Sequence, residues 1–374
     1  MGVFAQASGA ALVFGIAVLA PALRARYHLS LSEVGILLAA SNFGSIPALL
    51  PWGLLADRIG ERLVIGIGLS GAAAAVAGLA FEPSFVLLVV LLVLAGALSV
   101  SVNVASGRAV MHWFGAEQRG LAFGLRQTAI PLGGVVASLL LPQIVATAGL
   151  GGAFAALAGF CFAAAAAGLV WMREGPEASE DITLTEARHP LGDSRMWRLS
   201  WGSCLLLAIP VTVGGFIVLF LHSQRGLSTA AAAAVFAVGQ VLGGAGRIGF
   251  GSWSDRLGGR VRPMRWIGLA LAVAVSAAAA LVDAPLGLLL PALVVAVGLG
   301  MSWNGLSFTA AAELAGHARS GAAIGFQQTS LSITAAAVPP AFAAAVAATS
   351  WQAGFALVAV CPLGAAVVLR RLEV

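Results

Sequence analysis

Long apolar stretches, broken by short clusters of polar and charged residues, fill the chain from end to end. Twelve of them are long enough for helices of about 20 residues that cross a membrane. They do not alternate between apolar and polar positions, as the strands of an outer-membrane barrel do. The pattern predicts an all-α polytopic membrane protein with 12 transmembrane helices. The predicted spans are residues 5–23, 33–55, 63–81, 85–107, 120–147, 150–172, 198–221, 228–251, 265–282, 286–311, 321–347 and 351–369.

Composition excludes a water-soluble fold. Of the 374 residues, 60% are hydrophobic and only 9% are charged, whereas about a quarter of the residues of a soluble domain are charged. The only sustained polar stretch lies between the sixth and seventh spans. It divides the chain into an N-terminal six-helix half (1–172), a cytoplasmic linker (173–197) and a C-terminal six-helix half (198–374).

The basic residues, all of them arginine, indicate how the chain is inserted. If both termini are cytoplasmic, 15 arginines lie on that side, and only Arg24, Arg26 and Arg225 lie on the other. Such a bias is the positive-inside signal, so we expect a multi-pass protein of the cytoplasmic (inner) membrane with both termini inside. No nucleic-acid-binding pattern accompanies the net charge of +5. Three isolated cysteines suggest neither a metal site nor disulfides, and we expect no cofactor and a monomer in the lipid bilayer.

An internal repeat relates the two halves. The segment 53–62, GLLADRIGER, recurs 198 residues later at 251–260 as GSWSDRLGGR. At an offset of 201, Asn103 matches Asn304, and GLRQT at 124–128 matches GFQQT at 325–329. Matches in the same order at nearly one offset indicate a duplication.

The repeated loop resembles the signature loop of the major facilitator superfamily (MFS), and the resemblance covers the whole chain. It implies two pseudo-symmetric six-helix bundles and a secondary transporter. It also implies a conformational latch that closes the cytoplasmic side, made of Gly53, Asp57, Arg58, Gly60, Arg62, Gly251, Asp255, Arg256 and Arg260. We further expect the first glycine of each copy to permit close helix approach. As an alternative, the charges only anchor the loops at the membrane surface. Trp253 and Ser254 depart from the usual small apolar pair.

Two arginines fall inside predicted spans. Arg126 follows Arg119 by seven residues and Arg247 precedes Asp255 by eight, so each lies roughly 10 to 12 Å into the membrane. A buried arginine there costs upward of about 2.5 kcal/mol and turns to a cavity or a partner. No carboxylate is evident at mid-membrane, and a guanidinium group matches a carboxylate. The alternative is that backbone carbonyls and amides satisfy both arginines.

Polar residues at equivalent positions of the two halves complete the candidate site. Asn42 matches Gln240 at an offset of 198, and Arg126 matches Gln327 at 201. We expect a substrate site between the halves, although each amide could equally bond helices together and the tryptophan could be packing. The candidate substrate-binding residues are Arg126, Arg247, Asn42, Gln240, Asn103, Asn304, Gln327 and Trp303.

Together these features predict secondary active or facilitative transport of a small organic anion, a carboxylate, by alternating access. Arg247 resembles the arginine of the monocarboxylate and oxalate-type branches, although Gly243 replaces an acidic residue found there in many carriers. Protons are left open as the coupling ion. One alternative is a proton-driven multidrug or small-molecule efflux transporter, which would usually carry an acid in the first or fourth helix. Another is a membrane enzyme, which would need a clustered catalytic set.

Overall fold

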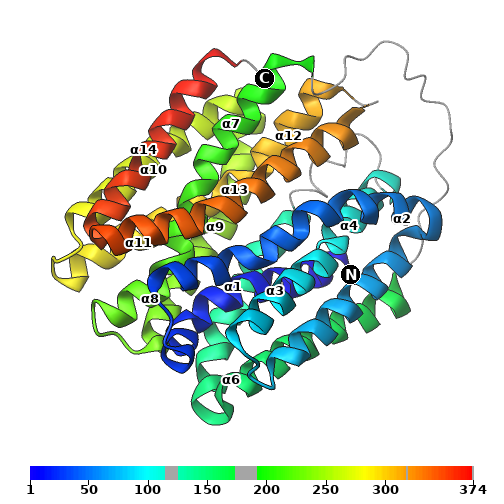
Figure 1. Ribbon diagram of the computed structural model, residues 1–374. Coiled ribbons are helices and arrows are strands. Elements are labelled where there is room, and N and C mark those ends of the chain that lie inside the picture. Colours follow the sequence, from blue (N-terminus) through cyan, green and yellow to red (C-terminus); the bar gives the residue numbers. More distant parts are fainter. Residues whose placement is uncertain (114–124, 173–191, 317–318, 373–374) are drawn as a thin grey trace.

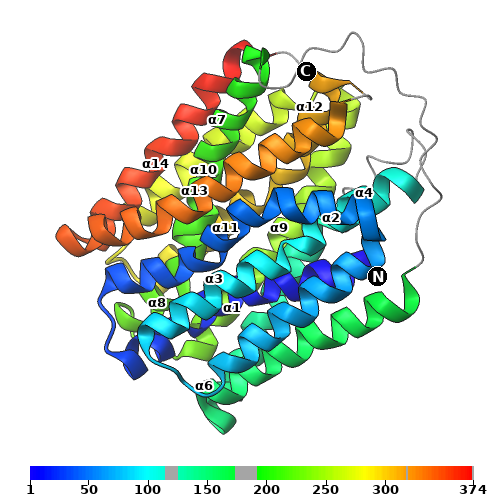
Figure 2. The same ribbon diagram turned by 45° about the vertical axis from the view of Figure 1, so that its right-hand side comes forward.

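The computed structural model describes residues 1–113, 125–172, 192–316 and 319–372, and in this part of the chain it contains helices and no strand. The helices run roughly alongside one another (Figures 1 and 2), and both termini lie at the same end. Residues 173–191 of the predicted linker lie outside the described residues, as does the beginning of the fifth predicted span, and residues 192–197 are described. The first half contains α1 (Gly2–Tyr27), α2 (Leu31–Leu79), α3 (Phe85–Ser99), α4 (Ser101–Trp113) and α6 (Ala129–Trp171). The second half contains α7 (Ser194–Ile209), the π-helical turn η2 (Pro210–Gly214), α8 (Gly215–Ser223), α9 (Thr229–Leu257), α10 (Val261–Ala280), α11 (Leu286–Ser302), α12 (Asn304–Ala315), α13 (Ser320–Ala348), α14 (Trp351–Val368) and the 3-10 turn η4 (Leu369–Arg371).

Two of the helices contain a sharp break that separates two spans. The described residues contain 10 helical segments long and apolar enough to cross a membrane. Within α2, Gly60 has φ 82°, and within α6, Gly149 has φ 71°. Glycine adopts such angles without steric cost, whereas other residues rarely do. Counting each broken helix as two spans raises 10 to 12, which confirms the predicted all-α polytopic fold.

Serine side chains define the starts of several spans. Ser30, Ser84, Ser228 and Ser350 each accept a hydrogen bond from the backbone N–H three residues later. Such caps satisfy N–H groups that the helix itself leaves unpaired. At the start of α2, Glu33 completes a capping box with Ser30. These short capped turns keep consecutive spans antiparallel neighbours.

Close packing within each side of the molecule depends on glycine. In the first part α1 packs on α6 and α2 on α3, and in the second part α9 packs on α11 and α10 on α14. A side chain at Gly44 would overlap the backbone of Val93, and one at Gly96 would overlap the backbone of Ser41. Small residues at such crossings let helix backbones approach in membranes. The two parts meet along a seam formed by α2 with α13, α6 with α9 and α1 with α8.

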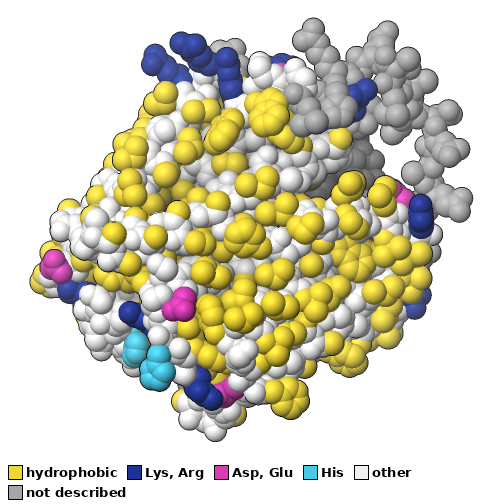
Figure 3. Space-filling model, viewed as in Figure 1, with side chains coloured by type: hydrophobic (Ala, Val, Ile, Leu, Met, Phe, Trp, Pro, Cys, Tyr) yellow, Lys and Arg dark blue, Asp and Glu magenta, His cyan; other side chains and the backbone are white. Residues whose placement is uncertain are grey.

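The outer surface has the polarity of a membrane protein. Apolar side chains cover the flank of the molecule, whereas charged side chains gather towards its two ends (Figure 3). Large apolar side chains outside the cavity wall are well exposed, among them Val86 and Val273. An exposed apolar band of this extent is placed favourably only in lipid.

Candidate functional site

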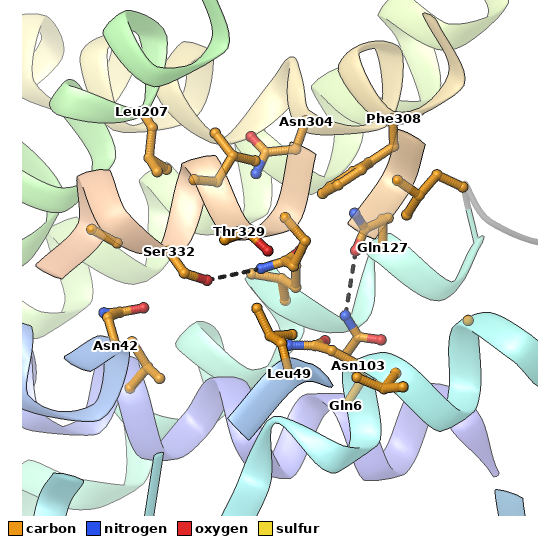
Figure 4. Close-up of a pocket in the computed structure, with 18 of the residues that line it drawn as sticks. Gln6, Asn42, Leu49, Asn103, Gln127, Leu207, Asn304, Phe308, Thr329 and Ser332 are labelled. Carbon is orange, nitrogen blue, oxygen red and sulfur yellow. Dashed lines mark hydrogen bonds between the residues drawn. The ribbon is translucent and has the colours of Figure 1, made fainter. Parts of the chain in front are cut away.

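A cavity of about 890 Å³ lies along the seam, lined by residues of α1, α2, α4, α7, α9, α12 and α13 (Figure 4). Its volume is in the range of small-molecule binding sites. Most of its wall is apolar. The polar and charged side chains that line it are Gln6, Asn42, Asp57, Asn103, Arg126, Gln127, Arg247, Asn304, Gln328, Thr329 and Ser332.

The cavity is closed on the side away from the termini. There a Cβ atom added to Gly35 would lie 2.8 Å from the Cβ atom of Ala343 and 2.9 Å from the carbonyl oxygen of Pro339. Phe14 and Phe236 meet across the seam with their ring centroids 5.8 Å apart. At the other end the wall extends to Asp57, three residues before the break at Gly60. The cavity therefore extends towards the end that carries both termini.

Arg247 on α9 joins the two sides of the seam. It is only 8% exposed. Its Nε donates to the carbonyl oxygen of Met301 and its Nη1 donates to the carbonyl oxygen of Gln127, each at 2.6 Å. The buried Nη2 has no hydrogen-bond partner in the described part of the chain. Because this arginine also lines the cavity, its positive charge lies at the cavity wall.

Arg126 approaches the cavity from the other side of the seam. Its Nε donates to Oγ of Ser106 and its Nη2 donates to the carbonyl oxygen of Asn103, each at 2.8 Å. Arg126 directly precedes Gln127, whose carbonyl oxygen accepts from Arg247. One short stretch of backbone therefore places both cationic side chains in the wall of one cavity.

The charge of the described cavity wall is positive. Two arginines line it, against the single carboxylate of Asp57 near one end. Water-poor surroundings strengthen the interaction of such charges with a ligand. Chemically, the arrangement suits a small ligand that carries negative charge.

Comparison with known proteins defines the family. Residues 2–339 match the Major Facilitator Superfamily. The chain belongs to this superfamily. It is 34% identical over 365 residues to the uncharacterized MFS-type transporter Rv2994 of Mycobacterium tuberculosis (strain ATCC 25618 / H37Rv), which covers 96% of this chain and 81% of the relative. The chain is therefore an MFS transporter, not an enzyme.

Two further similarities are more distant. A probable sulfoacetate transporter, SauU of Cupriavidus necator, is 28% identical over 186 residues, covering 48% of this chain and 43% of that protein. The crystal structure of a D-xylose-proton symporter aligns with a TM-score of 0.81 at 17% identity, covering 99% of this chain and 96% of that one. The structural alignment shows that the two proteins share the MFS fold.

The structure brings five of the eight residues expected at the substrate site to the wall of the MFS cavity: Asn42, Asn103, Arg126, Arg247 and Asn304. The other three do not line it. Gln240 is fully buried where α9 crosses α6 at Gly134, and Trp303 is fully buried between α11 and α12. Gln327 is also fully buried, and its hydrogen bonds to Ser200 and Ser307 measure 2.6 and 2.7 Å.

Five polar residues of the wall were not among the expected ones: Gln6, Gln127, Gln328, Thr329 and Ser332. Gln6 donates from Nε2 to Oε1 of Gln127 at 3.3 Å, and Gln328 donates from Nε2 to Oγ of Ser332 at 3.5 Å (Figure 4). Gln6 and Ser332 could have been predicted at the cavity because each is a polar residue within an apolar span. The repeat at offset 201 drew attention to Gln327 instead of its neighbour Gln328.

The second copy of the repeated loop forms two ion pairs among the described residues. In the second copy Arg260 donates to Asp255, and its Nε donates to Oε1 of Glu313 at 3.0 Å. Partial burial lowers the pKa of Arg260, but these two hydrogen bonds outweigh it and raise the pKa above its ordinary value. The remaining arginines of the expected latch, Arg58, Arg62 and Arg256, are exposed and form no ion pair with the described residues.

The expectation of close helix approach at the first glycine of each loop is wrong. A Cβ atom at Gly53 would meet its nearest neighbour at 3.9 Å, and one at Gly251 would meet nothing within 4 Å. Gly53 instead lines the cavity, beside Asp57. The loop glycines with a geometric requirement are Gly60, with φ 82°, and Gly258, with φ 65°. There the chain reverses at a positive φ that favours glycine.

Proposed function

We propose that this MFS transporter carries a small organic anion, a carboxylate, across the cytoplasmic membrane. The observation that carries the proposal is Arg247, a cation that lines the cavity and donates only to backbone carbonyl oxygens among the described residues, with its buried Nη2 unpaired there. Leaving a charged donor unpaired away from water costs several times more than leaving a neutral one. A carboxylate in the cavity would offset the positive charge of this side chain.

Arg126 would supply the second positive charge. Its Nε donates to the hydroxyl of Ser106 and its Nη2 donates to the backbone carbonyl of Asn103. Charge-assisted hydrogen bonds to a carboxylate are roughly twice as strong as neutral ones. Arg247 and Arg126 thus act as the electrostatic anchors of the site.

Amides in the same wall would orient the rest of the substrate. The buried Oδ1 of Asn304 has no partner among the described residues, and Asn42 and Asn103 also line the cavity. These groups suit hydroxyl or amide substituents of an organic acid. The partial similarity to a probable sulfoacetate transporter supports the same substrate class, because sulfoacetate is an organic anion.

We propose alternating access by rocking of two halves, residues 1–172 and 198–374, joined by the linker 173–197. The side that is closed at Gly35 and Phe14 would open, while the end near Asp57 would close through the duplicated loops. The arginine bias favours a cytoplasmic position for the termini and that end. Since one chain contains the entire cavity, the monomer would be the transporting unit.

Ligand-dependent thermal unfolding of the purified protein tests the proposal. A panel of mono- and dicarboxylates, with sulfoacetate included, is compared with neutral sugars and cationic drugs. At 100 times its Kd, an anion that binds the folded state adds about 2.7 kcal/mol to the free energy of unfolding. This stabilisation should vanish in Arg247→Ala and persist in Arg370→Ala, which removes an exposed arginine distant in sequence from the cavity wall.

The alternative function gives a different pattern. If cationic drugs raise the unfolding temperature and no anion in the panel does so, the protein is better described as an efflux transporter of drugs. If anions stabilise the wild type and Arg247→Ala equally, the substrate class stands but the proposed anchor is wrong.

A further inference from the structure

A second hollow lies on the flank of the molecule, where α9, α10 and α11 meet. This groove has a volume of about 470 Å³ and is separate from the transport cavity. It is lined by Phe250, Trp253, Leu257, Arg262, Trp266, Ile267, Ala270 and Leu299. We call it the flank groove. Apart from its single arginine, its wall is apolar.

The position of the groove along α10 corresponds to the boundary between lipid headgroups and acyl chains. Arg262 is the second residue of α10, and Trp266 and Ala270 follow it at intervals of four, which places all three on one helix face. At 1.5 Å per residue the face descends about 12 Å from Arg262 to Ala270. Trp266 is 54% exposed, and Val273 farther along is 70% exposed. An exposed apolar face beside interfacial tryptophans faces the bilayer.

The aromatic side chains give the groove a defined wall. The rings of Phe250 and Trp253 lie one turn apart on α9 with their centroids 6.1 Å apart. Trp266 contributes from α10 and Leu299 from α11. Helices held at these positions leave room that no side chain of the described residues fills. An extended apolar chain can occupy such a space.

The charged end of the groove carries an arginine that pairs with no acidic residue of the described chain. Arg262 is exposed and forms no ion pair with the described residues, although the nearby Arg260 binds both Asp255 and Glu313. One turn farther along, the Nε of Arg265 is buried without a hydrogen-bond partner in the described chain. Positive charge at this level is therefore not neutralised by the nearby carboxylates.

These features are absent from the first copy of the repeat. After Arg62, the first copy contains no basic residue before Arg108, whereas the second continues from Arg260 to Arg262 and Arg265. Trp253, at offset 198, stands where the first copy has Leu55. Trp253 and Arg262, two positions at which the second copy departs from the first, therefore both line the flank groove. The duplicated latch does not account for them.

We propose that the flank groove binds one anionic phospholipid from the leaflet at the end that carries the termini. Its phosphate group contacts Arg262, with Arg265 adding to the local positive charge. One acyl chain lies along Trp253, Trp266 and Leu299. Basic pockets between transmembrane helices at this level recognise anionic headgroups. The occupied groove would brace α9, the helix that carries Arg247, against α10 and α11.

Native mass spectrometry of the full-length protein in a nonionic detergent tests the proposal. Dioleoylphosphatidylglycerol and dioleoylphosphatidylcholine, which have the same acyl chains, are titrated separately. The wild type should bind one phosphatidylglycerol more tightly than phosphatidylcholine. Arg262→Ala should weaken phosphatidylglycerol binding about fivefold, the factor for one arginine near an anionic headgroup, with phosphatidylcholine unchanged. Arg262→Lys should retain the preference.

Two further variants separate the parts of the site. Arg370→Ala removes an exposed arginine at the same end that is not part of the groove, and it should leave the preference intact. Trp266→Ala should weaken both lipids, because it removes apolar wall rather than charge. Equal affinity of the wild type for the two lipids, or an unchanged preference in Arg262→Ala, would overturn the proposal. Complete displacement by millimolar inorganic phosphate would also overturn it, since the site would then recognise free phosphate.

Discussion

Arg126 and Gln327 occupy equivalent positions in the two halves and form equivalent hydrogen bonds to serine, but only Arg126 lines the cavity. In the first half, Nε of Arg126 donates to Oγ of Ser106 at 2.8 Å. In the second, 201 residues later, Nε2 of Gln327 donates to Oγ of Ser307 at 2.7 Å. Arg126 lines the cavity, whereas Gln327 is fully buried and does not. Both positions therefore share the hydrogen bond to serine, but only the first carries a positive charge.

The difference follows from the number of donors that each side chain carries. An amide has two N–H groups and one oxygen, and inside its own bundle the oxygen of Gln327 accepts from Ser200 and one N–H donates to Ser307. A guanidinium group has five N–H groups and a charge. Neutral oxygens of a tightly packed bundle can accept some of those hydrogen bonds but cannot neutralise the charge. We infer that the asymmetry between the two positions is the basis of anion binding, and the following predictions test it.

Arg126→Gln copies the second half into the first and should have the largest effect. The glutamine can still reach Ser106, so the free energy of unfolding should change little. The affinity for the transported anion should fall about 10- to 100-fold, because a hydrogen bond to a charged group contributes about 1.5 to 3 kcal/mol. Equilibrium binding and thermal unfolding measure the two effects. Full affinity in this variant would demote Arg126 to a packing role.

Gln327→Leu should show the opposite pattern. Removing the amide leaves Ser200 and Ser307 with fewer partners at a fully buried position. We expect a loss of about 1 to 3 kcal/mol in the free energy of unfolding, with the Kd of the anion unchanged within about twofold. Denaturation in detergent with and without the anion measures both. A large change in Kd without loss of stability would place Gln327 in the substrate site.

Alanine substitutions of the equivalent serines, Ser106 and Ser307, should have smaller effects and can be compared directly. Ser106→Ala removes a neutral hydrogen bond that orients Arg126 and should weaken anion binding about fivefold, corresponding to about 1 kcal/mol. Ser307→Ala should cost a similar free energy in stability, because it removes bonds to Gln327 and Ser203, and should leave binding alone. Identical behaviour of the two variants would contradict the asymmetry.

Glu313→Gln should have the smallest effect on stability. Its partner Arg260 also binds Asp255, and the side chain of Glu313 is 42% exposed. Exposed ion pairs contribute at most about 1 kcal/mol and are screened by salt. We expect a change below that value in thermal unfolding at low salt, and less at high salt. A larger and salt-independent loss would show that this ion pair holds the second bundle together.

Hydropathy was sufficient to predict the fold but not the way in which consecutive spans are connected. The predicted spans 33–55 and 63–81 were expected to flank a loop, yet α2 continues through both with a break at Gly60. Hydropathy reports which residues prefer lipid, not which backbone hydrogen bonds persist beside a charged segment. The same limit applies at Gly149, where one glycine separates two spans.

The charged residues of the candidate site could be predicted from the sequence. Arg126 and Arg247 were expected at a cavity because an arginine in the membrane needs one, and both line it. Gln240 shows the limit. It lies seven residues before Arg247 on the same face of α9, yet it packs against Gly134 and does not reach the cavity. Which part of a helix face meets a neighbouring helix depends on how the helices cross, and the sequence of α9 does not contain that information.

The central claim is that the cavity recognises the charge of its substrate. The most direct test measures uptake of a labelled carboxylate, the one that stabilises the protein best, into proteoliposomes. Unlabelled carboxylate competes in one experiment, and the carboxamide of the same carbon skeleton competes in the other. The two competitors have nearly the same size and differ in charge. We predict that the carboxylate inhibits uptake at least 10-fold more strongly, the factor for about 1.4 kcal/mol, and that Arg247→Ala abolishes this preference. Equal inhibition by the two competitors in the wild type would contradict the account.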